Sequence, residues 1–333
     1  MYRSDGPHMT KPWFLLADIG GTNARFALGD PIAGELREAA SLPAADYRDF
    51  HSALSDYLGR IQRLEEWSAR PQEACLAVAA PIGDASVRFT NSEWFIDRGD
   101  LAASLQIKQP VLINDFAAVA HAVARLGKDD WVQFGSGVAA TDAPIAVLGP
   151  GTGLGVASIV PVGDSYCVIP GEGGHVDFAP VSDEEMEILR ILRQRFEHVS
   201  VERLLSGPGL ENLYSALAAV RGKEVNTLKD HVISARALAG EDLLAIDCLQ
   251  LFCAILGSVA GNLALTLGAH GGVYVAGGIA PRMLDFIGQS GFRQRFCSKG
   301  RYRDYLDAIP TRFVTRSDVG LFGALTHLLH KTT

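Results

Sequence analysis

The sequence has little basic charge, few cysteines and no long uninterrupted apolar run. Its 333 residues carry 30 lysines and arginines against 38 aspartates and glutamates, a formal net charge of −8. A protein that binds mainly nucleic acid usually has an excess of basic residues, because it must contact phosphate backbones. We therefore expect no nucleic-acid partner, although a small anion can still bind to backbone N–H groups.

The cysteines and the apolar runs exclude further classes of protein. No apolar run approaches the roughly 20 residues that span a bilayer. The N-terminus also lacks a basic segment followed by a hydrophobic core, so nothing resembles a signal peptide. We expect a cytoplasmic protein with no membrane partner. The five cysteines are scattered, at positions 75, 167, 248, 253 and 297, and form no Cys-x-x-Cys pair. We therefore expect them to be reduced thiols without a redox or metal role.

Two domains are expected, because 333 residues are too many for one hydrophobic core. The run Gly6-Pro7-His8-Met9 resembles the junction left when an expression tag is cleaved, so residues 1–10 are interpreted as a leader or tag remnant. A polar, glycine-containing stretch at residues 127–142 indicates a boundary inside the remaining chain. Beyond this stretch, residues 243–267 carry helical periodicity and are mostly apolar, which predicts one long helix.

Two glycine-threonine turns stand out, each directly behind a run of apolar residues that favour β-structure. The first is Asp18-Ile19-Gly20-Gly21-Thr22, and the second runs from Gly149 to Gly155 around Gly151-Thr152. Another apolar stretch follows each turn, so the pattern predicts two β-hairpins and hints at a duplicated fold. Glycine permits a positive φ and lets the backbone approach a ligand closely, so both turns are candidate phosphate cradles. A single turn of this kind is more often only a tight turn.

Neither turn belongs to the two common nucleotide motifs. The dinucleotide-binding pattern Gly-x-Gly-x-x-Gly does not fit, because its final glycine is missing in every register of the second turn. The P-loop pattern Gly-x-x-x-x-Gly-Lys-Ser/Thr does not occur in the chain. If ATP binds, Mg²⁺ and backbone N–H groups must hold its phosphates without a P-loop lysine. Asp18 is well placed to hold that Mg²⁺, directly or through water; otherwise it is an ordinary polar residue at a strand end.

The pair Asn114-Asp115 is the sharpest catalytic candidate. It follows the apolar strand Val111–Ile113 and precedes an alanine-rich helix over residues 117–126. A carboxylate at a strand end can take the proton of an incoming hydroxyl, while the neighbouring amide holds the acceptor. Without the phosphate turns, a helix N-cap would be the better interpretation of this pair.

Two further segments carry polar chemistry. In Glu172-Gly173-Gly174-His175, a carboxylate and an imidazole separated by two glycines can turn toward one ligand and bind adjacent hydroxyl groups. A plain polar glycine loop explains this segment equally well. From the residues alone, Glu202 is best interpreted as an ordinary exposed helix residue.

Taken together, these motifs resemble the bacterial ATP-dependent glucokinases over almost the whole chain, from about residue 13 to the C-terminal helix. The matching motifs are Asp18 to Arg25, Ile113 to Phe116, Gly149 to Gly155, Pro170 to Phe178, Leu205 to Leu210 and Ala276 to Ile279. This family belongs to the hexokinase and actin-like ATPase superfamily. The resemblance implies an α/β protein with the actin-like ATPase (ribonuclease H-like) fold, with two α/β domains around a central cleft. Residues 11–126 plus 318–333 would form the small domain and residues 127–317 the large one.

The resemblance also implies site residues. Two groups of residues would bind ATP. Those around its phosphates would be Ala17, Asp18, Ile19, Gly20, Gly21, Thr22, Gly151 and Thr152. Gly277 and Gly278 would lie near the adenosine. Glucose would be held by Asn114, Asp115, Glu172, His175 and Glu202, with Asn91 nearby. For Glu202, the resemblance overrules the interpretation from the residues alone. A related group of sugar kinases has a cysteine-rich zinc motif near its glucose-site histidine; this chain has no such cluster, so no zinc is expected.

The implied activity is transfer of the γ-phosphoryl group of ATP, with Mg²⁺, to the 6-hydroxyl of D-glucose, with Asp115 as general base. Two alternatives remain: a kinase for another hexose or small polyol, and a non-catalytic nucleotide switch of the same fold. The family resemblance also suggests a homodimer.

Overall fold

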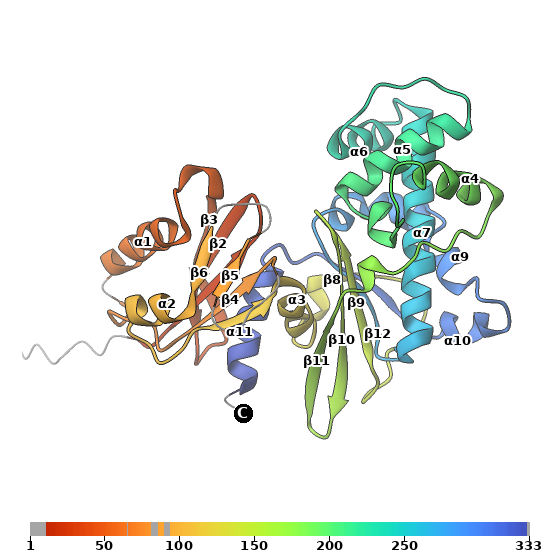
Figure 1. Cartoon of the computed structure of the whole chain (residues 1–333). Coiled ribbons are helices and arrows are strands. Elements are labelled where there is room, and N and C mark those ends of the chain that lie inside the picture. Colours follow the sequence, from red (N-terminus) through yellow and green to blue (C-terminus); the bar gives the residue numbers. More distant parts are fainter. Residues whose placement is uncertain (1–10, 65, 81–85, 90–93, 332–333) are drawn as a thin grey trace, which may run out of the picture. The chain divides into compact units, whose positions relative to one another are not determined.

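The computed structural model describes residues 11–64, 66–80, 86–89 and 94–331. The predictions for residues 1–10 and for Asn91 lie outside these residues. The chain forms two compact units, which Figure 1 shows coloured along the sequence. Unit 1 consists of Met1–Arg125 and Ser317–Thr333, and unit 2 is the segment Leu126–Arg316 between them.

Unit 1 is built on a five-stranded sheet with the order β3-β2-β1-β4-β7. The first three strands are antiparallel neighbours, whereas β4 and β7 run parallel to β1. The strands are β1 (Phe14–Ile19), β2 (Asn23–Asp30), β3 (Glu35–Pro43), β4 (Glu73–Val78) and β7 (Val111–Asn114). A separate two-stranded antiparallel sheet consists of β5 (Ser86–Arg88) and β6 (Phe95–Asp97).

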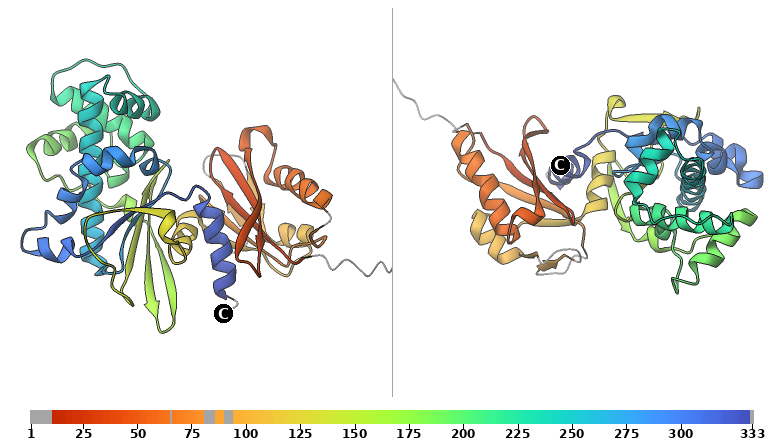
Figure 2. Two further views of the ribbon diagram at one scale, coloured as in Figure 1. Left: turned by 180° about the vertical axis from the view of Figure 1, so that it is seen from behind. Right: turned by 90° about the horizontal axis from the view of Figure 1, so that it is seen from above.

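Helices cover both faces of this sheet, which explains the continuous apolar run of β1. Leu15, Ala17 and Ile19 share one buried cluster with side chains of α1 (Phe50–Ile61) and α2 (Arg98–Leu105). Phe14 and Leu16 point to the other face and pack with α11 (Val319–Lys331). Figure 2 shows α1 and α2 on one side of the sheet and the C-terminal helix α11 on the other.

Two glycines allow α11 to lie unusually close to its neighbours. A Cβ at Gly323 would be 1.8 Å from the carbonyl oxygen of Ala118, which belongs to α3 (Asp115–Val123). A Cβ at Gly320 would be 2.7 Å from the carboxyl carbon of Asp18 at the end of β1. The C-terminal helix therefore contacts both the strand that leads into the first glycine turn and the helix that begins with Asp115.

Unit 2 repeats the same plan around a six-stranded sheet with the order β11-β10-β9-β12-β13-β8. Again three antiparallel strands come first, and β12 and β13 run parallel to β9. The strands are β8 (Trp131–Phe134), β9 (Ile145–Pro150), β10 (Leu154–Val162), β11 (Ser165–Gly171), β12 (Gly272–Val275) and β13 (Thr311–Val314). Both predicted hairpins are confirmed: β1–β2 and β9–β10 occupy the same position in their two sheets.

Helices of unit 2 surround the long helix α7 (Leu243–Leu267), whose bounds agree with those expected from the sequence. The others are α4 (Asp183–Leu192), α5 (Gly207–Val220), α6 (Asp230–Leu238), α8 (Leu284–Gln289), α9 (Phe292–Cys297) and α10 (Arg303–Asp307). By length and composition α7 could cross a membrane. Polar residues such as Asp247 and Gln250 interrupt its apolar sequence, so it contains no long uninterrupted apolar run. However, 67% of its most apolar window is buried inside the protein, as expected of a core helix.

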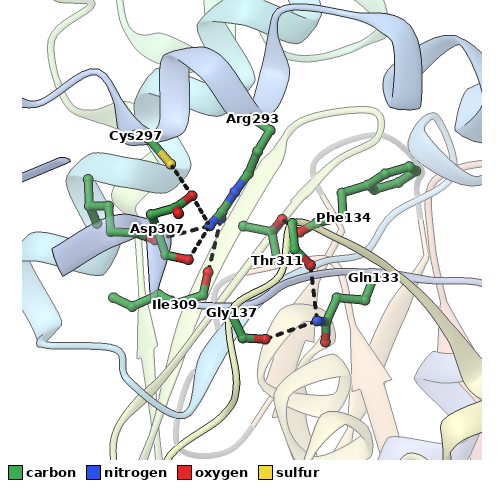
Figure 3. A network of polar contacts seen from close by, with 10 residues as sticks. Gln133, Phe134, Gly137, Arg293, Cys297, Asp307, Ile309 and Thr311 are labelled. Atoms are coloured by element: carbon green, nitrogen blue, oxygen red, sulfur yellow. Dashed lines mark hydrogen bonds and ion pairs between the residues drawn. The ribbon is translucent and has the colours of Figure 1, made fainter. Parts of the chain in front are cut away.

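Polar contacts join α9 to the end of α10 and to the loop before β13, and they join the outer strands β13 and β8 to each other (Figure 3). The guanidinium group of Arg293 donates hydrogen bonds to the carbonyl oxygens of Leu306, Asp307 and Ile309, at 3.2, 2.8 and 2.9 Å. Thr311 Oγ1 donates to the carbonyl oxygen of Phe134 at 2.6 Å and so joins β13 to β8. Thr311 is the first residue of β13, so the network lies at the end of the sheet opposite the second glycine turn. We interpret it as structural.

Candidate active site

In unit 1, the first glycine turn and Asn114-Asp115 lie at the same edge of the sheet. Ile19 of β1 pairs with Val78 of β4, which in turn pairs with Asn114 of β7. All three strands are parallel and end together, so the residues that follow β1 and β7 lie two strand spacings apart, about 10 Å. Residues 79 and 80 follow β4 between them.

The first turn is tight, but its glycines are not needed for a positive φ. The Gly20 N–H donates to the carbonyl oxygen of Asn23 at 3.0 Å, and the carbonyl of Thr22 accepts from the Ala44 N–H at 2.9 Å. Gly20 and Gly21 are not among the described glycines with a positive φ, and neither is Gly151 in the second turn. A Cβ at Gly20 would meet only the Asn23 carbonyl, at 3.8 Å. The open space beside this glycine leaves room for a ligand close to the backbone, which was the second reason to expect glycine here.

Asp18 lies at the end of β1 and forms an ion pair with Arg25. The distance from Arg25 Nη1 to Asp18 Oδ2 is 3.2 Å, and the Asp18 side chain is only 19% exposed. Burial raises the pKa of the Asp18 carboxyl group, and the charge of Arg25 opposes this rise. Sequence reasoning assigned no role to Arg25, although residues 18 and 25 are directly opposite in the hairpin, so counting outward from the turn would have found the pair.

Asn114 caps helix α3, as the alternative interpretation from the sequence suggested. Its Oδ1 accepts hydrogen bonds from the N–H groups of Phe116 and Ala117, at 2.9 and 3.1 Å. Capping uses the amide oxygen, and the amide NH₂ is the group that this side chain can offer to a ligand. Asp115 is the first residue of α3, is partly exposed, and accepts from the Phe116 N–H at 2.8 Å. The cap and a catalytic role are therefore compatible.

In unit 2, the second glycine turn lies beside the Gly277-Gly278 segment. The Ala276 N–H, just after β12, donates to the carbonyl oxygen of Leu148 in β9 at 2.8 Å. Gly277 has a φ of +91°, and a Cβ there would be 2.5 Å from the carbonyl oxygen of Pro150. Only glycine tolerates both this positive φ and so short a distance to a backbone oxygen, so the Gly277-Gly278 segment can lie directly against the second glycine turn.

Glu172 and His175 lie at the same edge of the unit 2 sheet, because β11 ends at Gly171 opposite Val156 of β10. The short 3₁₀ turn Gly173–His175 packs directly on β10: a Cβ at Gly174 would be 2.2 Å from the carbonyl oxygen of Leu154. Both side chains are exposed, and Glu172 Oε2 lies 4.0 Å from His175 Nε2. The two glycines thus place a carboxylate and an imidazole next to the strand that leaves the glycine turn.

Glu202 reaches the glycine turn itself. It lies in the 3₁₀ turn Val201–Arg203, is partly buried, and its Oε2 accepts from the Leu154 N–H at 2.8 Å. The interpretation from the residues alone, an ordinary exposed helix residue, was therefore wrong. Together with His175, Glu202 lines a pocket of about 310 Å³ whose other lining residues are Arg195, Phe196, Glu197, His198, Ser200 and Arg203.

The site residues thus fall into two groups, one in each unit. Unit 1 brings together the end of β1 with its turn and the pair Asn114-Asp115. Unit 2 gathers its members at one edge of its sheet, namely Gly151, Thr152, Gly277, Gly278, Glu172, His175 and Glu202. Within the described ranges there is no group of three or more His, Cys, Asp or Glu side chains that could hold a metal ion.

Comparison with known proteins identifies the family. A sequence model of the family described as Glucokinase matches residues 15–331. This chain belongs to the glucokinase family. A glucokinase from Salmonella arizonae is 45% identical over 323 residues, which cover 96% of this chain and 98% of that protein.

Solved structures agree with this result. The crystal structure of a glucokinase from an Antarctic psychrotroph is similar with a TM-score of 0.84 at 39% identity, covering 96% of this chain and 99% of that one. A glucokinase from Streptomyces griseus of the ROK family, crystallised with glucose and AMPPNP, has a TM-score of 0.61 at 18% identity, over 94% of this chain and 98% of that one. At that identity the likeness concerns the fold alone. The fold is the actin-like ATPase fold of these sugar kinases, as the resemblance implied.

Proposed function

We propose that this protein is a glucokinase that transfers the γ-phosphoryl group of MgATP to the 6-hydroxyl of D-glucose, producing glucose 6-phosphate and ADP. Membership of the family supports the reaction. The structural observation that carries it is that Gly151-Thr152, Gly277-Gly278 and Glu172 lie at one edge of the unit 2 sheet. In this proposal residues 11–126 plus 318–333 form the small domain, and residues 127–317 form the large one.

The donor would be held mainly by backbone groups. We assign the ATP phosphates to Ala17 through Thr22 and to Gly151-Thr152, and the adenosine to Gly277-Gly278. In these turns N–H groups supply the hydrogen bonds that a P-loop supplies elsewhere. Because the transition state of phosphoryl transfer is loose, most of the acceleration would come from alignment and charge stabilisation.

The residues present fit a magnesium ion at Asp18. Mg²⁺ keeps several of its waters and is usually held by one or two carboxylates together with substrate phosphates, so a dense cluster of ligands is not required. The Asp18 carboxylate is largely buried, and burial raises its pKa, so a cation beside it would relieve the cost of its charge. When bound, the ion would neutralise charge on the donor phosphates.

The acceptor would be held by polar side chains. Asp115 would orient the 6-hydroxyl group and take its proton as the bond to phosphorus forms, and Asn114 would hold the sugar through its amide. Glu172, His175 and Glu202 would bind other hydroxyls, with Asn91 nearby. A site that expects these hydroxyl groups can reject a sugar that leaves its polar groups unpaired by up to roughly 10⁴-fold.

One assay separates this proposal from its alternatives. ADP release from MgATP is measured alone and with glucose, mannose, fructose or glucosamine. Stimulation mainly by glucose supports a glucokinase, and stimulation mainly by another sugar indicates a different hexose kinase. Slow hydrolysis that no hexose changes would contradict the proposal and favour a nucleotide switch.

Two further properties belong to the same proposal. We assign the protein to the cytoplasm, where its substrates are found. We also propose that two chains form a homodimer. Light scattering coupled to gel filtration tests the homodimer, since one chain has a mass of 35.6 kDa. A mass of a single chain at micromolar concentration would contradict it.

A further inference from the structure

The carboxylate of Glu202 is bound to the backbone of the second glycine turn. Its Oε2 accepts from the Leu154 N–H at 2.8 Å, where β10 begins directly after Gly151-Thr152-Gly153. A Cβ at Gly153 would lie 2.5 Å from the same oxygen atom. Glycine at position 153 therefore leaves the space that the carboxylate fills.

The rest of the turn is tied to the same segment of chain. The Gly207 N–H, at the first residue of α5, donates to the carbonyl oxygen of Gly151 at 2.8 Å. Ser206 caps α5, and its Oγ also donates to the carbonyl oxygen of Glu202 at 2.9 Å. The segment 202–207 thus holds the turn at both ends, at Gly151 through backbone and at Leu154 through the Glu202 side chain.

From this geometry we infer that Glu202 is a positioning residue that couples sugar binding to nucleotide binding. One carboxylate oxygen accepts a hydrogen bond from the Leu154 N–H, and the other accepts a hydrogen bond from a hydroxyl group of the sugar. A carboxylate has two oxygens and about four lone-pair directions, so it can serve both partners at once. The inference rests on the proposed function for the sugar, whereas the bond to the turn is present without one.

The expected sign separates this role from a purely electrostatic one. Removing a negative charge near the phosphates should by itself strengthen nucleotide binding, because like charges repel. Loss of the bond to Leu154 acts in the opposite direction, since the turn is released and its N–H groups are no longer held in place. Binding energies couple reciprocally, so a turn held by Glu202 also implies tighter sugar binding when nucleotide is present.

The test measures the affinity for MgADP by calorimetry in the absence of any sugar. Glu202→Ala should weaken MgADP binding by about 10-fold, the value of one hydrogen bond to a charged group. Glu202→Gln keeps a carbonyl oxygen for Leu154, so its MgADP affinity should stay within about 3-fold of wild type while its KM for glucose rises. Glu197→Ala is the matched control: it removes an exposed carboxylate from the same pocket and should leave the affinity unchanged or slightly higher.

A double-mutant cycle tests the contact directly. Gly153→Ala should weaken MgADP binding by about 10-fold, because the new methyl group displaces the carboxylate. In the Glu202→Ala background the same substitution should cost less than about 2-fold, because the obstructing carboxylate is gone.

Two results would overturn the inference: unchanged MgADP affinity in Glu202→Ala, or additive effects in the cycle. Neither result depends on the identity of the sugar. If the wild-type chain failed to phosphorylate glucose, the proposed function would fail, while the nucleotide measurements would still decide the role of Glu202 at the turn.

Discussion

Asp18 and Arg25 face each other across the β1–β2 hairpin, with Arg25 Nη1 3.2 Å from Asp18 Oδ2. The partly exposed arginine does not fully offset the burial of the carboxyl group, whose pKa is raised. Gly320 of α11 lies against the same carboxyl group. Such a carboxylate is costly in the free protein, which is expected of a residue retained for a bound cation rather than for stability.

Asp18→Asn should therefore unfold at a higher temperature than the wild type at pH 7. Because the folded pKa lies above the unfolded value, the unfolded state releases its proton first as pH rises from about 4. The wild type loses stability through that interval, up to the folded pKa, and does not regain it at higher pH. The neutral asparagine avoids this loss, so the difference in melting temperature should shrink toward pH 4. Turnover with MgATP should fall at least 10²-fold, about the value of one lost electrostatic contact.

The control for that experiment is Asp56→Asn. Hydrogen bonds from Tyr47 and Arg60 lower the pKa of the Asp56 carboxyl group. The same substitution there should lower the melting temperature at pH 7, opposite in sign to Asp18→Asn. A melting temperature of Asp18→Asn below that of the wild type at pH 7 would contradict the interpretation of Asp18.

Asp115→Ala should leave glucose binding measurable while kcat falls by about 10²- to 10⁴-fold, the range of a lost general base. The helix should persist, because Asn114 and not Asp115 provides its side-chain cap. Asp100→Ala is a matched control, since Asp100 is an exposed aspartate in the first turn of α2 in the same unit. Steady-state kinetics with glucose binding followed separately decide the matter, and near-wild-type turnover would remove Asp115 from the mechanism.

A histidine pair between α3 and α11 should make unit 1 sensitive to acid. His327 Nδ1 and His121 Nε2 are 2.9 Å apart. Mainly through burial, the pKa of His121 is lowered to about 3 and that of His327 to about 4, with His330 and Lys331 adding positive charge nearby. Because both folded values lie below the unfolded value of about 6.5, stability is fully present above pH 6.5 and is lost as pH falls toward 4.

The expected loss is about 1.4 kcal/mol per pH unit for each histidine in that interval. His327→Gln cannot titrate, so the free energy of unfolding, measured with urea from pH 4.5 to 7, should depend on pH with about half the slope. His231→Gln changes an exposed histidine in unit 2 and serves as the matched control. An unaltered slope in His327→Gln would show that other groups cause the acid sensitivity.

Gly323→Ala should destabilise unit 1 by about 3 kcal/mol, as expected of overpacking against rigid backbone. The added Cβ would be 1.8 Å from the Ala118 carbonyl oxygen, so α3 or α11 must move, and kcat should fall because α3 begins with Asp115. The matched control is Gly59→Ala in the interior of α1, where a Cβ would meet nothing within 4 Å. That change should stabilise the protein by about 0.5–1 kcal/mol. Equal effects of the two substitutions would contradict the close packing of α11.

Long periodic elements and turns between apolar runs could be predicted from the sequence. The bounds of α7 agree with the predicted helix, and both hairpins form where apolar residues flank a glycine turn. Short elements were less visible: the stretch at residues 127–142 was interpreted as a polar boundary, yet it contains β8. Four residues at the edge of a sheet carry too few side chains for a period, and their pairing with β13 is a tertiary property.

The sequence by itself determined which carboxylates, imidazole and glycines stand next to strand ends, and therefore which groups are candidates for contact with a phosphate or a sugar. Tertiary structure alone decided how those groups are held. Glu202 is 48 residues from Leu154, and nothing in the local pattern shows that its carboxylate accepts from that N–H. Likewise, Gly153, Gly174 and Gly323 are glycines because distant atoms fill the space of a Cβ, and only the folded chain brings those atoms there.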